Sequence, residues 1–301
     1  FIAHWASLEP ATADHLSVSA KDALALRLVA RRTWRFFEKF VTAKDNMLPP
    51  DNFQEDPNPV IAHRTSPTNI GLYLLSIIAA RDFGWLGTLD GLERLEATFT
   101  TMSKLQRFKG HFYNWYETTA LRALELKYIS SVDSGNLAGH LIVLGNACRE
   151  IISGPVFAQQ WTSGLMDTLA LLQDSVHPQT TQRRPLGPKQ IQLDKAIEAF
   201  SETLINVPSN PMDIAQWFSN LVQLADVVLT CAHALGLKSG GSSESQIIVW
   251  AEALHTSILS HRSDFDLLMP WANLPAPQIP LGKDSAALLG AVPSLIGMPG
   301  H

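Results

Sequence analysis

The stretch SPTNIGLYLLSIIAARDFGWLG, residues 66–87, decides the fold class of this 301-residue chain. Ser66 followed by Pro67 predicts the start of a helix, because a serine side chain accepts hydrogen bonds from free backbone amides and proline suits the first helical position. The segment 70–80 is apolar nearly all round, so we expect this helix to be buried on every side. Residues 83–87 then predict a tight turn into another helix.

The same alternation of helices recurs on both sides of this stretch. Residues 19–42 and 88–104 predict amphipathic helices, each with one apolar face and one charged face. A second helix that is apolar all round is expected from Asp133 to Cys148, and a tight turn at 153–155 leads into a helix that ends near Asp174. Further helices are expected at 189–204, 211–236 and 243–262, with a short one near 284–290.

Long loops alternate with the short turns, and this fixes how the helices lie. Helices joined by short turns are antiparallel, so the two buried inner helices point the same way. The long loops 44–66 and 107–133 therefore both reach the N-terminal ends of the inner helices. We expect an all-α fold built as an array of α/α-hairpins. The chain predicts fewer helices than a closed ring needs, so it is expected to form an incomplete (α/α)6 toroid.

Composition excludes several classes of function. Apolar residues make up 46% of the chain and charged residues 17%, which favours a folded domain with a sizeable core. The net charge of −5 argues against a partner nucleic acid. No uninterrupted apolar run reaches the length of a membrane span, and no signal peptide is seen. The arginines at 27, 31, 32 and 35 are expected to form a solvated helix face.

Polar and aromatic residues gather in the long loops, where a sugar-binding cleft would lie. Sugars require rings that stack on their C–H faces and carboxylate, amide or guanidinium groups that bond adjacent hydroxyls. Helix N-termini add fixed N–H donors. The four segments with this mixture are 49–57, 62–69, 110–117 and 130–136.

Structural roles are the alternative for several of these residues. Ser66, Asp133 and Ser134 could serve only as helix caps. Trp115 and Tyr116 could be plugs that cover the inner helices. Arg64 needs an anionic partner if it is buried, and three residues could supply it. Those residues are Asp51, Glu55 and Asp133.

A glycosidase needs two carboxylates that flank the scissile bond. Asp133 and Glu55 are the candidate catalytic pair if the chain is a self-contained glycosidase, although the sequence does not fix their separation. The chain has no G-x-S-x-G elbow, no P-loop and no H-E-x-x-H motif, which argues against serine hydrolase, phosphate-binding and zinc-protease chemistry. We expect no metal site.

Several long motifs occur in an order that resembles one protein family. They are residues 31–38, 48–57, 62–75, 79–85, 110–116 and 132–140. In these motifs the chain resembles the central region of bacterial cyclic β-1,2-glucan synthases, closely over residues 17–152 and loosely elsewhere.

The resemblance implies a large multi-pass protein of the bacterial inner membrane, with this segment soluble on the cytoplasmic side. A membrane glycosyltransferase region would make linear glucan from UDP-glucose, and a glycoamylase-like (α/α)6 region would close the ring by retaining transglycosylation. The chain itself is expected to need no cofactor. Its expected partners are the β-1,2-glucan chain and the remaining domains of the same polypeptide.

The resemblance also implies which residues bind glucan. The family's catalytic glutamates are expected downstream, so the matched loops would line sugar subsites, and an isolated fragment would be inactive. The residues carried over as substrate-binding are Asp51, Asn52, Gln54, Glu55, Arg64, Asn69, Asn114, Trp115, Asp133 and Asn136. A non-catalytic helical scaffold between the membrane region and later domains is the competing hypothesis.

On this interpretation the chain divides into four parts. Residues 1–18 would be a linker that leaves a preceding membrane region, and residues 19–175 would carry the α/α-hairpins of the glucan cleft. Residues 176–270 would form a further helical region, and residues 271–301 a Pro-rich linker.

Overall fold

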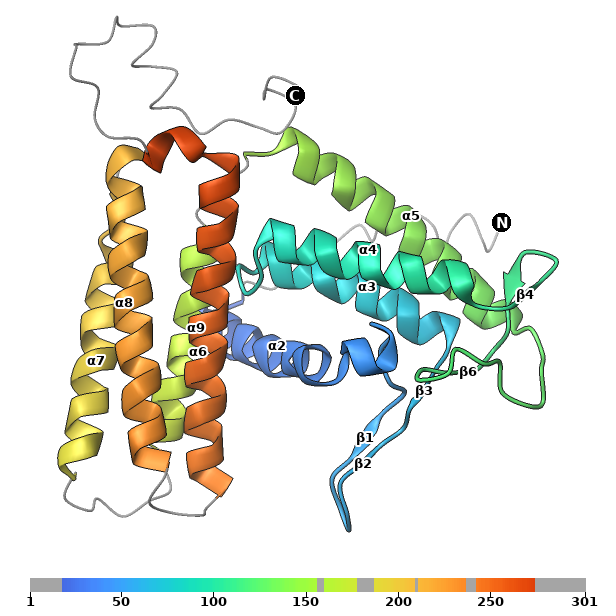
Figure 1. The fold of residues 1–301 in the computed structure, drawn as a ribbon, viewed down its shortest axis with the longest axis horizontal. Coiled ribbons are helices and arrows are strands. Elements are labelled where there is room, and N and C mark those ends of the chain that lie inside the picture. Colours follow the sequence, from blue (N-terminus) through green and yellow to red (C-terminus); the bar gives the residue numbers. More distant parts are fainter. Residues whose placement is uncertain (1–17, 156–159, 178–186, 209–210, 237–241, 274–301) are drawn as a thin grey trace, which may run out of the picture.

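The computed structural model describes residues 18–155, 160–177, 187–208, 211–236 and 242–273. The predicted all-α class is confirmed, with eight helices and a few two-residue strands in those ranges (Figure 1). The helices are α2 (Ala20–Phe40), α3 (Pro67–Asp82), α4 (Thr88–Lys104), α5 (Ser131–Ser153), α6 (Gln160–Val176), α7 (Pro188–Ile205), α8 (Pro211–Gly236) and α9 (Ser242–Leu268).

The short strands and 3₁₀ turns belong mainly to the long loops. Antiparallel pairs join β1 (Phe53–Gln54) to β2 (Val60–Ile61), β3 (Arg64–Thr65) to β6 (Tyr116–Glu117) and β4 (Arg107–Phe108) to β5 (His111–Phe112). The 3₁₀ turns are η1 (Ala43–Asp45) and η2 (Pro270–Asn273). The pairing of β3 with β6 brings the two long loops together.

Helix α3 follows its sequence signals closely. The Ser66 hydroxyl accepts a hydrogen bond from the Asn69 amide, and Pro67 occupies the first turn. The side chains of Ile70, Tyr73, Leu74 and Ile77 are fully buried, as expected of a core helix, but Leu72 is 49% exposed, so the expectation of burial on every side was wrong.

Helices α2 to α5 form the first of two packed units, which we call the hairpin unit. Thr68 at the start of α3 bonds Asp133 at the start of α5, so the inner helices lie parallel with their N-termini together, as predicted. Helices α2 and α4 flank α3, and their C-terminal ends lie at the same end, where Thr101 of α4 bonds the carbonyl of Asn46. Whether these helices belong to a ring stays a prediction.

Helix α5 differs from its prediction in both start and burial. It begins two residues early, because the Ser130 hydroxyl takes the capping role and accepts from the Asp133 amide. Only Leu137 and Leu144 of α5 are buried, while Ile142 is 68% exposed. The expectation of burial all round was wrong for this chain, because α5 packs on α3 by one face and no other described element covers its far side.

Helices α6 to α9 form the second unit, the helix bundle, whose axes run across those of the hairpin unit (Figure 1). Its core includes Trp161, Phe218 and Phe265, and the ring of Phe218 contacts the rings of both others. Helix α6 was expected as the next outer helix of the array, but its buried residues belong to this core. The two cores thus separate between Ile151 and Trp161, before the division predicted at residue 175.

The two units meet at the turn between α3 and α4. A Cβ on Gly164 of α6 would overlap the backbone of Gly84, so both residues must be glycine for this contact. Gly84 also has a φ of +79°, which favours glycine. From α9, Ser257, Ser260, His261 and Asp264 all bond the backbone of residues 84–89.

The arginines of α2 reinforce this junction. Arg27 forms a two-point ion pair with Asp167 of α6, and Arg31 is fully buried, bonds Thr168 and lies against the rings of Trp85 and Trp250. The expectation of a solvated face was therefore wrong for Arg27 and Arg31, whereas Arg32 is exposed as expected. Sequence periodicity placed these arginines opposite the apolar stripe, but α6 and α9 pack on that side.

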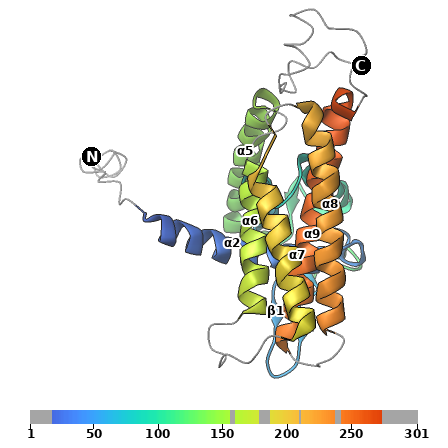
Figure 2. The same cartoon turned by 90° about the vertical axis from the view of Figure 1, so that its left-hand side faces the viewer.

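Helix α8 is the one helix in the described part that is long and apolar enough to cross a membrane. This is weak evidence for a span. Gln216, Asn220, Gln223 and Asp226 lie on its exposed side, as in an amphipathic helix of a bundle. The first turns of α2, which starts beside α6, extend beyond the body of the structure (Figure 2).

The terminal linkers predicted at 1–18 and 271–301, and the short helix predicted at 284–290, lie almost wholly outside the described residues.

Candidate functional site

The candidate site lies at the N-terminal ends of α3 and α5, where the two long loops arrive. Eight of the ten residues carried over as glucan-binding take part in contacts there. They are Asp51, Asn52, Arg64, Asn69, Asn114, Trp115, Asp133 and Asn136. These contacts form two networks joined through Trp115.

The first network centres on Asp51. Its Oδ2 accepts from the Arg64 guanidinium at 2.9 and 3.1 Å and from the Asn52 amide at 3.1 Å. Its Oδ1 accepts from Asn69 in the first turn of α3 at 3.2 Å. Asp51 is therefore the anionic partner of Arg64, one of the three residues that could supply it. Arg64 itself is half-exposed rather than buried, with 51% of its side chain accessible.

The second network centres on Asp133. Its Oδ1 accepts from the Thr68 hydroxyl at 2.6 Å, and Thr68 accepts in turn from Asn136 at 3.2 Å. With the Asn114 amide nitrogen facing Asp133, that nitrogen donates to Oδ2 at 2.8 Å. Both carboxylate oxygens of Asp133 thus have a donor, and its position in the first turn of α5 adds the favourable helix dipole.

Trp115 connects the two networks. The Arg64 guanidinium lies over its ring, 5.0 Å from the centroid. Its indole N–H donates to the Asn114 carbonyl at 2.6 Å, and the same carbonyl accepts from the Tyr128 hydroxyl at 2.7 Å. The buried side-chain amide of Asn114 therefore bonds Asp133, Trp115 and Tyr128 at once.

Gln54 and Glu55 do not join these networks. Both are exposed in the β1–β2 hairpin, which projects away from the start of α5 (Figure 1). The Gln54 amide donates to the Asp56 carbonyl within its own hairpin. The structure gives Glu55 no contact with the Asp133 network.

Two residues of this site were not among the predicted binding residues. Thr68 lies in the predicted sugar-binding segment 62–69 but was not named individually, and Tyr128 was not singled out, because its role depends on pairing with Asn114 across the loop. The backbone amide of Asn114 also donates to the Tyr128 carbonyl at 2.9 Å. No local pattern around Tyr128 signals that contact.

His63 is held on a separate arrangement beside the site. Its Nδ1 lies 2.7 Å from Oδ1 of the buried Asp45, which also accepts from the Thr118 hydroxyl. His63 lies directly before β3 and contacts Asp45, whereas Arg64 within β3 contacts Asp51. Asp45, His63 and Thr118 therefore secure the loop junction behind the site.

Tyr116 anchors the loop that carries Trp115. Its hydroxyl accepts from the Tyr113 amide and donates to the Gln106 carbonyl. Burial raises the pKa of this hydroxyl, so it stays a neutral donor. Tyr116 acts as a cover over the inner helices, one of the structural alternatives considered from sequence.

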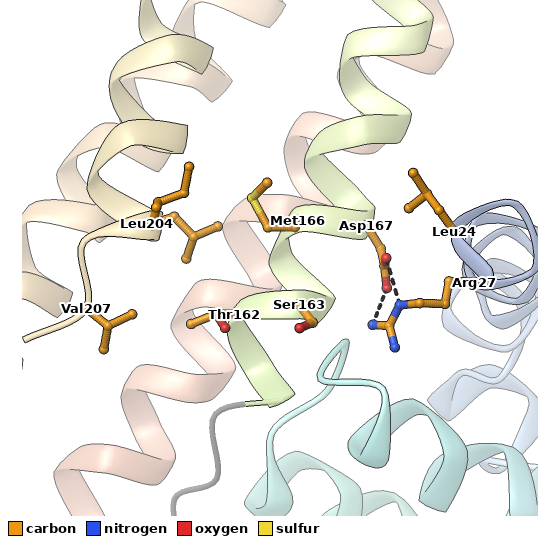
Figure 3. A pocket seen from close by; sticks show the side chains of 9 residues that line it. Leu24, Arg27, Thr162, Ser163, Met166, Asp167, Leu204 and Val207 are labelled. Carbon is orange, nitrogen blue, oxygen red and sulfur yellow. Dashed lines mark hydrogen bonds and ion pairs between the residues drawn. The ribbon is translucent and has the colours of Figure 1, made fainter. Parts of the chain in front are cut away.

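A separate cavity of about 340 Å³ lies between α2, α6 and the end of α7 (Figure 3). Its walls include Leu24, Met166 and Val207, and the Arg27–Asp167 ion pair closes one side. Asp167 also accepts from the Trp85 indole at 2.8 Å. Because this carboxylate already serves the junction between the units, the cavity offers no free charged group for a ligand.

Comparison with known proteins supports the predicted resemblance. The chain is 39% identical over 269 residues, 88% of its length, to "Cyclic beta-(1,2)-glucan synthase NdvB" from Rhizobium meliloti (strain 1021). The similarity therefore extends well beyond residues 17–152. The chain spans 10% of that relative's length. No family model matches the chain.

Proposed function

We propose that this chain is part of a cyclic β-1,2-glucan synthase and that the ends of α3 and α5 hold the growing glucan in sugar subsites. The observation that carries the proposal is the gathering of eight carried-over residues at one place, in a chain 39% identical to a synthase of that name. They supply amides, carboxylates, a half-exposed guanidinium and one aromatic side chain beside two helix N-termini.

The state of the carboxylates favours binding over catalysis in this chain. Asp51 has three side-chain partners, and both oxygens of Asp133 accept hydrogen bonds. A general acid must carry a proton and a nucleophile must be free to attack, and neither suits a carboxylate whose oxygens are committed to donors. The catalytic groups would then be supplied by other parts of the polypeptide.

The wider parts of the proposal concern the whole enzyme. It would be a glycosyltransferase-type enzyme that uses UDP-glucose as donor and closes its product by retaining transglycosylation. This segment would lie on the cytoplasmic side of the bacterial inner membrane. Its partners would be the glucan chain and the remaining domains of the same polypeptide.

One observation favours a second function, that of a helical scaffold. Helix α5 leaves Ile142 and Val143 more than half exposed, which is costly unless another element covers them. A scaffold would use this face to hold a neighbouring domain. The two functions are compatible, since the face lies along α5 and the polar networks lie at its start.

Titration calorimetry with linear β-1,2-glucan oligosaccharides tests the proposal. The full chain should bind them and should bind β-1,3- and β-1,4-linked glucans of equal length more weakly. Arg64→Ala should weaken binding about tenfold, because it removes a guanidinium that donates to sugar hydroxyls and leaves Asp51 without its ion-pair partner. Arg122→Ala, an exposed arginine paired with Glu117, serves as the matched control.

A folded chain that gives no heat with β-1,2-glucan would contradict the subsite proposal and leave the scaffold function. Equal weakening by both arginine variants would show a general charge effect rather than a site.

A further inference from the structure

An aromatic residue can bind a sugar only if one ring face is open to it. Sugar C–H groups pack on that face, and the ring must stay in position when the ligand is absent for the contact to be strong. Trp115 was expected to play this part. One face of its ring instead lies under the Arg64 guanidinium, and its N–H is committed to Asn114.

Tyr128 meets both requirements. Its hydroxyl donates to the Asn114 carbonyl at 2.7 Å, and its own backbone carbonyl accepts from the Asn114 amide at 2.9 Å. Two contacts to one buried residue therefore fix the ring. Although its hydroxyl and its backbone carbonyl are both hydrogen-bonded, Tyr128 is 53% exposed.

The surroundings of Tyr128 suit a ligand that has both apolar and polar faces. Leu126 is 87% exposed on the same loop, and Val132 is 68% exposed at the start of α5. Asn114 bonds both the Tyr128 hydroxyl and the Asp133 carboxylate, so it links the ring to the polar network. An apolar platform thus lies beside a fixed polar network, as recognition of a pyranose ring requires.

Other aromatic rings of the same loops fit less well. The Arg107 guanidinium lies over Phe112 at 4.2 Å, so that ring has a partner already. Phe108 is 51% exposed on β4 but has no hydrogen-bonding group to fix its ring to the Asp133 network.

We propose that Tyr128 is the platform on which a glucose unit of the β-linked glucan stacks, with Asn114 as the residue that positions it. This inference rests on the proposed function and assigns the stacking role to Tyr128 in place of Trp115. Trp115 then serves to position Arg64 and Asn114.

Calorimetry of the full chain with β-1,2-glucan oligosaccharides tests the assignment. Tyr128→Ala should weaken binding about tenfold, and Tyr128→Leu should weaken it equally, because leucine keeps the bulk and loses the flat ring. Tyr128→Phe should weaken it only about twofold, since the ring remains and its anchor is lost. Phe108→Ala, a control of similar exposure, should bind as the unchanged chain does. Circular dichroism and urea midpoints identify any variant that fails to fold.

Tyr128→Leu and a folded Tyr128→Ala that bind glucan as tightly as the unchanged chain would overturn the inference. So would equal weakening by Phe108→Ala, which would indicate a general apolar patch. If the unchanged chain binds no glucan, the proposed function fails and the inference fails with it. If the unchanged chain binds glucan and the Tyr128 variants bind it equally well, the proposed function stands and the stacking role of Tyr128 is lost.

Discussion

The helix bundle and the hairpin unit use apolar helices in different ways. In the bundle, α8 and α9 bury their apolar faces against each other and against α6 and α7, so the core closes within the chain. In the hairpin unit, α5 is also rich in apolar residues but buries only Leu137 and Leu144. The contrast teaches that apolar composition predicts a need for burial and does not say which element will meet it.

The two units also differ in where their polar residues lie. The bundle places polar side chains such as Gln216 and Asn220 on its outer surface and uses one stripe of α9 to hold the turn at residues 84–89. The hairpin unit concentrates its polar networks at the ends of α3 and α5. Under the proposed function, the hairpin unit would bind the glucan and the bundle would support it.

Truncation of a large side chain should have the greatest effect in the bundle. Phe218 is fully buried among Trp161, Trp217 and Phe265, so Phe218→Ala should lower the free energy of unfolding by about 3–5 kcal/mol. Ile142→Ala on the exposed face of α5 should change it by less than about 0.5 kcal/mol. Urea denaturation followed by circular dichroism measures both. An equal loss in the two variants would show that the face of α5 is covered within this chain.

Acid should weaken the junction between the two units through His261. Burial lowers the pKa of its imidazole to about 4, while its Nε2 donates to the Gly84 carbonyl. The unfolded histidine titrates near its usual value of about 6.5, so the unfolded state takes up the proton first as pH falls. Stability should therefore be complete above that value and decline by about 3 kcal/mol as pH falls to the folded pKa.

Neighbouring groups make a variant control necessary for this titration. Asp90 favours the charged imidazole, and burial raises the pKa of Asp264, which gives an opposite dependence on pH. His261→Gln keeps an N–H donor for Gly84 and has no titration. The difference in unfolding free energy between the unchanged chain and His261→Gln should become smaller as the pH is lowered. A constant difference from pH 7 to pH 4 would contradict the assignment.

Loss of the cap that α9 provides for α4 should have a smaller effect. Helix α4 has Gly87 at its N-cap with no side-chain bond, and the Asp264 carboxylate accepts from the amides of Thr88 and Leu89 instead. Asp264→Ala should cost about 1–2 kcal/mol, and Asp264→Asn less, because one acceptor remains. Hydrogen exchange should show faster exchange at the first turn of α4. Unchanged exchange there would mean that α4 is capped by other groups.

Local signals in the sequence predicted most of the fold. The Ser66-Pro67 start and the apolar run after it define α3, and the turn at residues 83–87 was placed correctly. The position of α6 could not be predicted, because its apolar side chains suit either an outer helix of the hairpin array or a bundle. That choice depends on backbone contact between Gly84 and Gly164, which are 80 positions apart.

The site was predictable where its residues cluster in sequence. Arg64 and Asn69 lie in one motif, and their shared partner Asp51 lies in the motif before it. Gln54 and Glu55 belong to the same motif as Asp51, yet a two-residue β-pairing carries them into a projecting hairpin. Tyr128 lies outside every motif, because only the fold of its loop brings it to Asn114.

The smallest effect tests the open face of α5 most directly. Gly139 lies on that face, and a Cβ there would meet nothing within 4 Å. Glycine in a helix is less stable than alanine by about 0.5–1 kcal/mol, so Gly139→Ala should stabilise this chain by that amount. Gly71→Ala is the matched control and should destabilise it, because its Cβ would overlap the ring of His140. If α5 is covered by a closely packed helix in a longer form of the protein, Gly139→Ala should instead destabilise that form. The same sign in both forms would show that this face stays open.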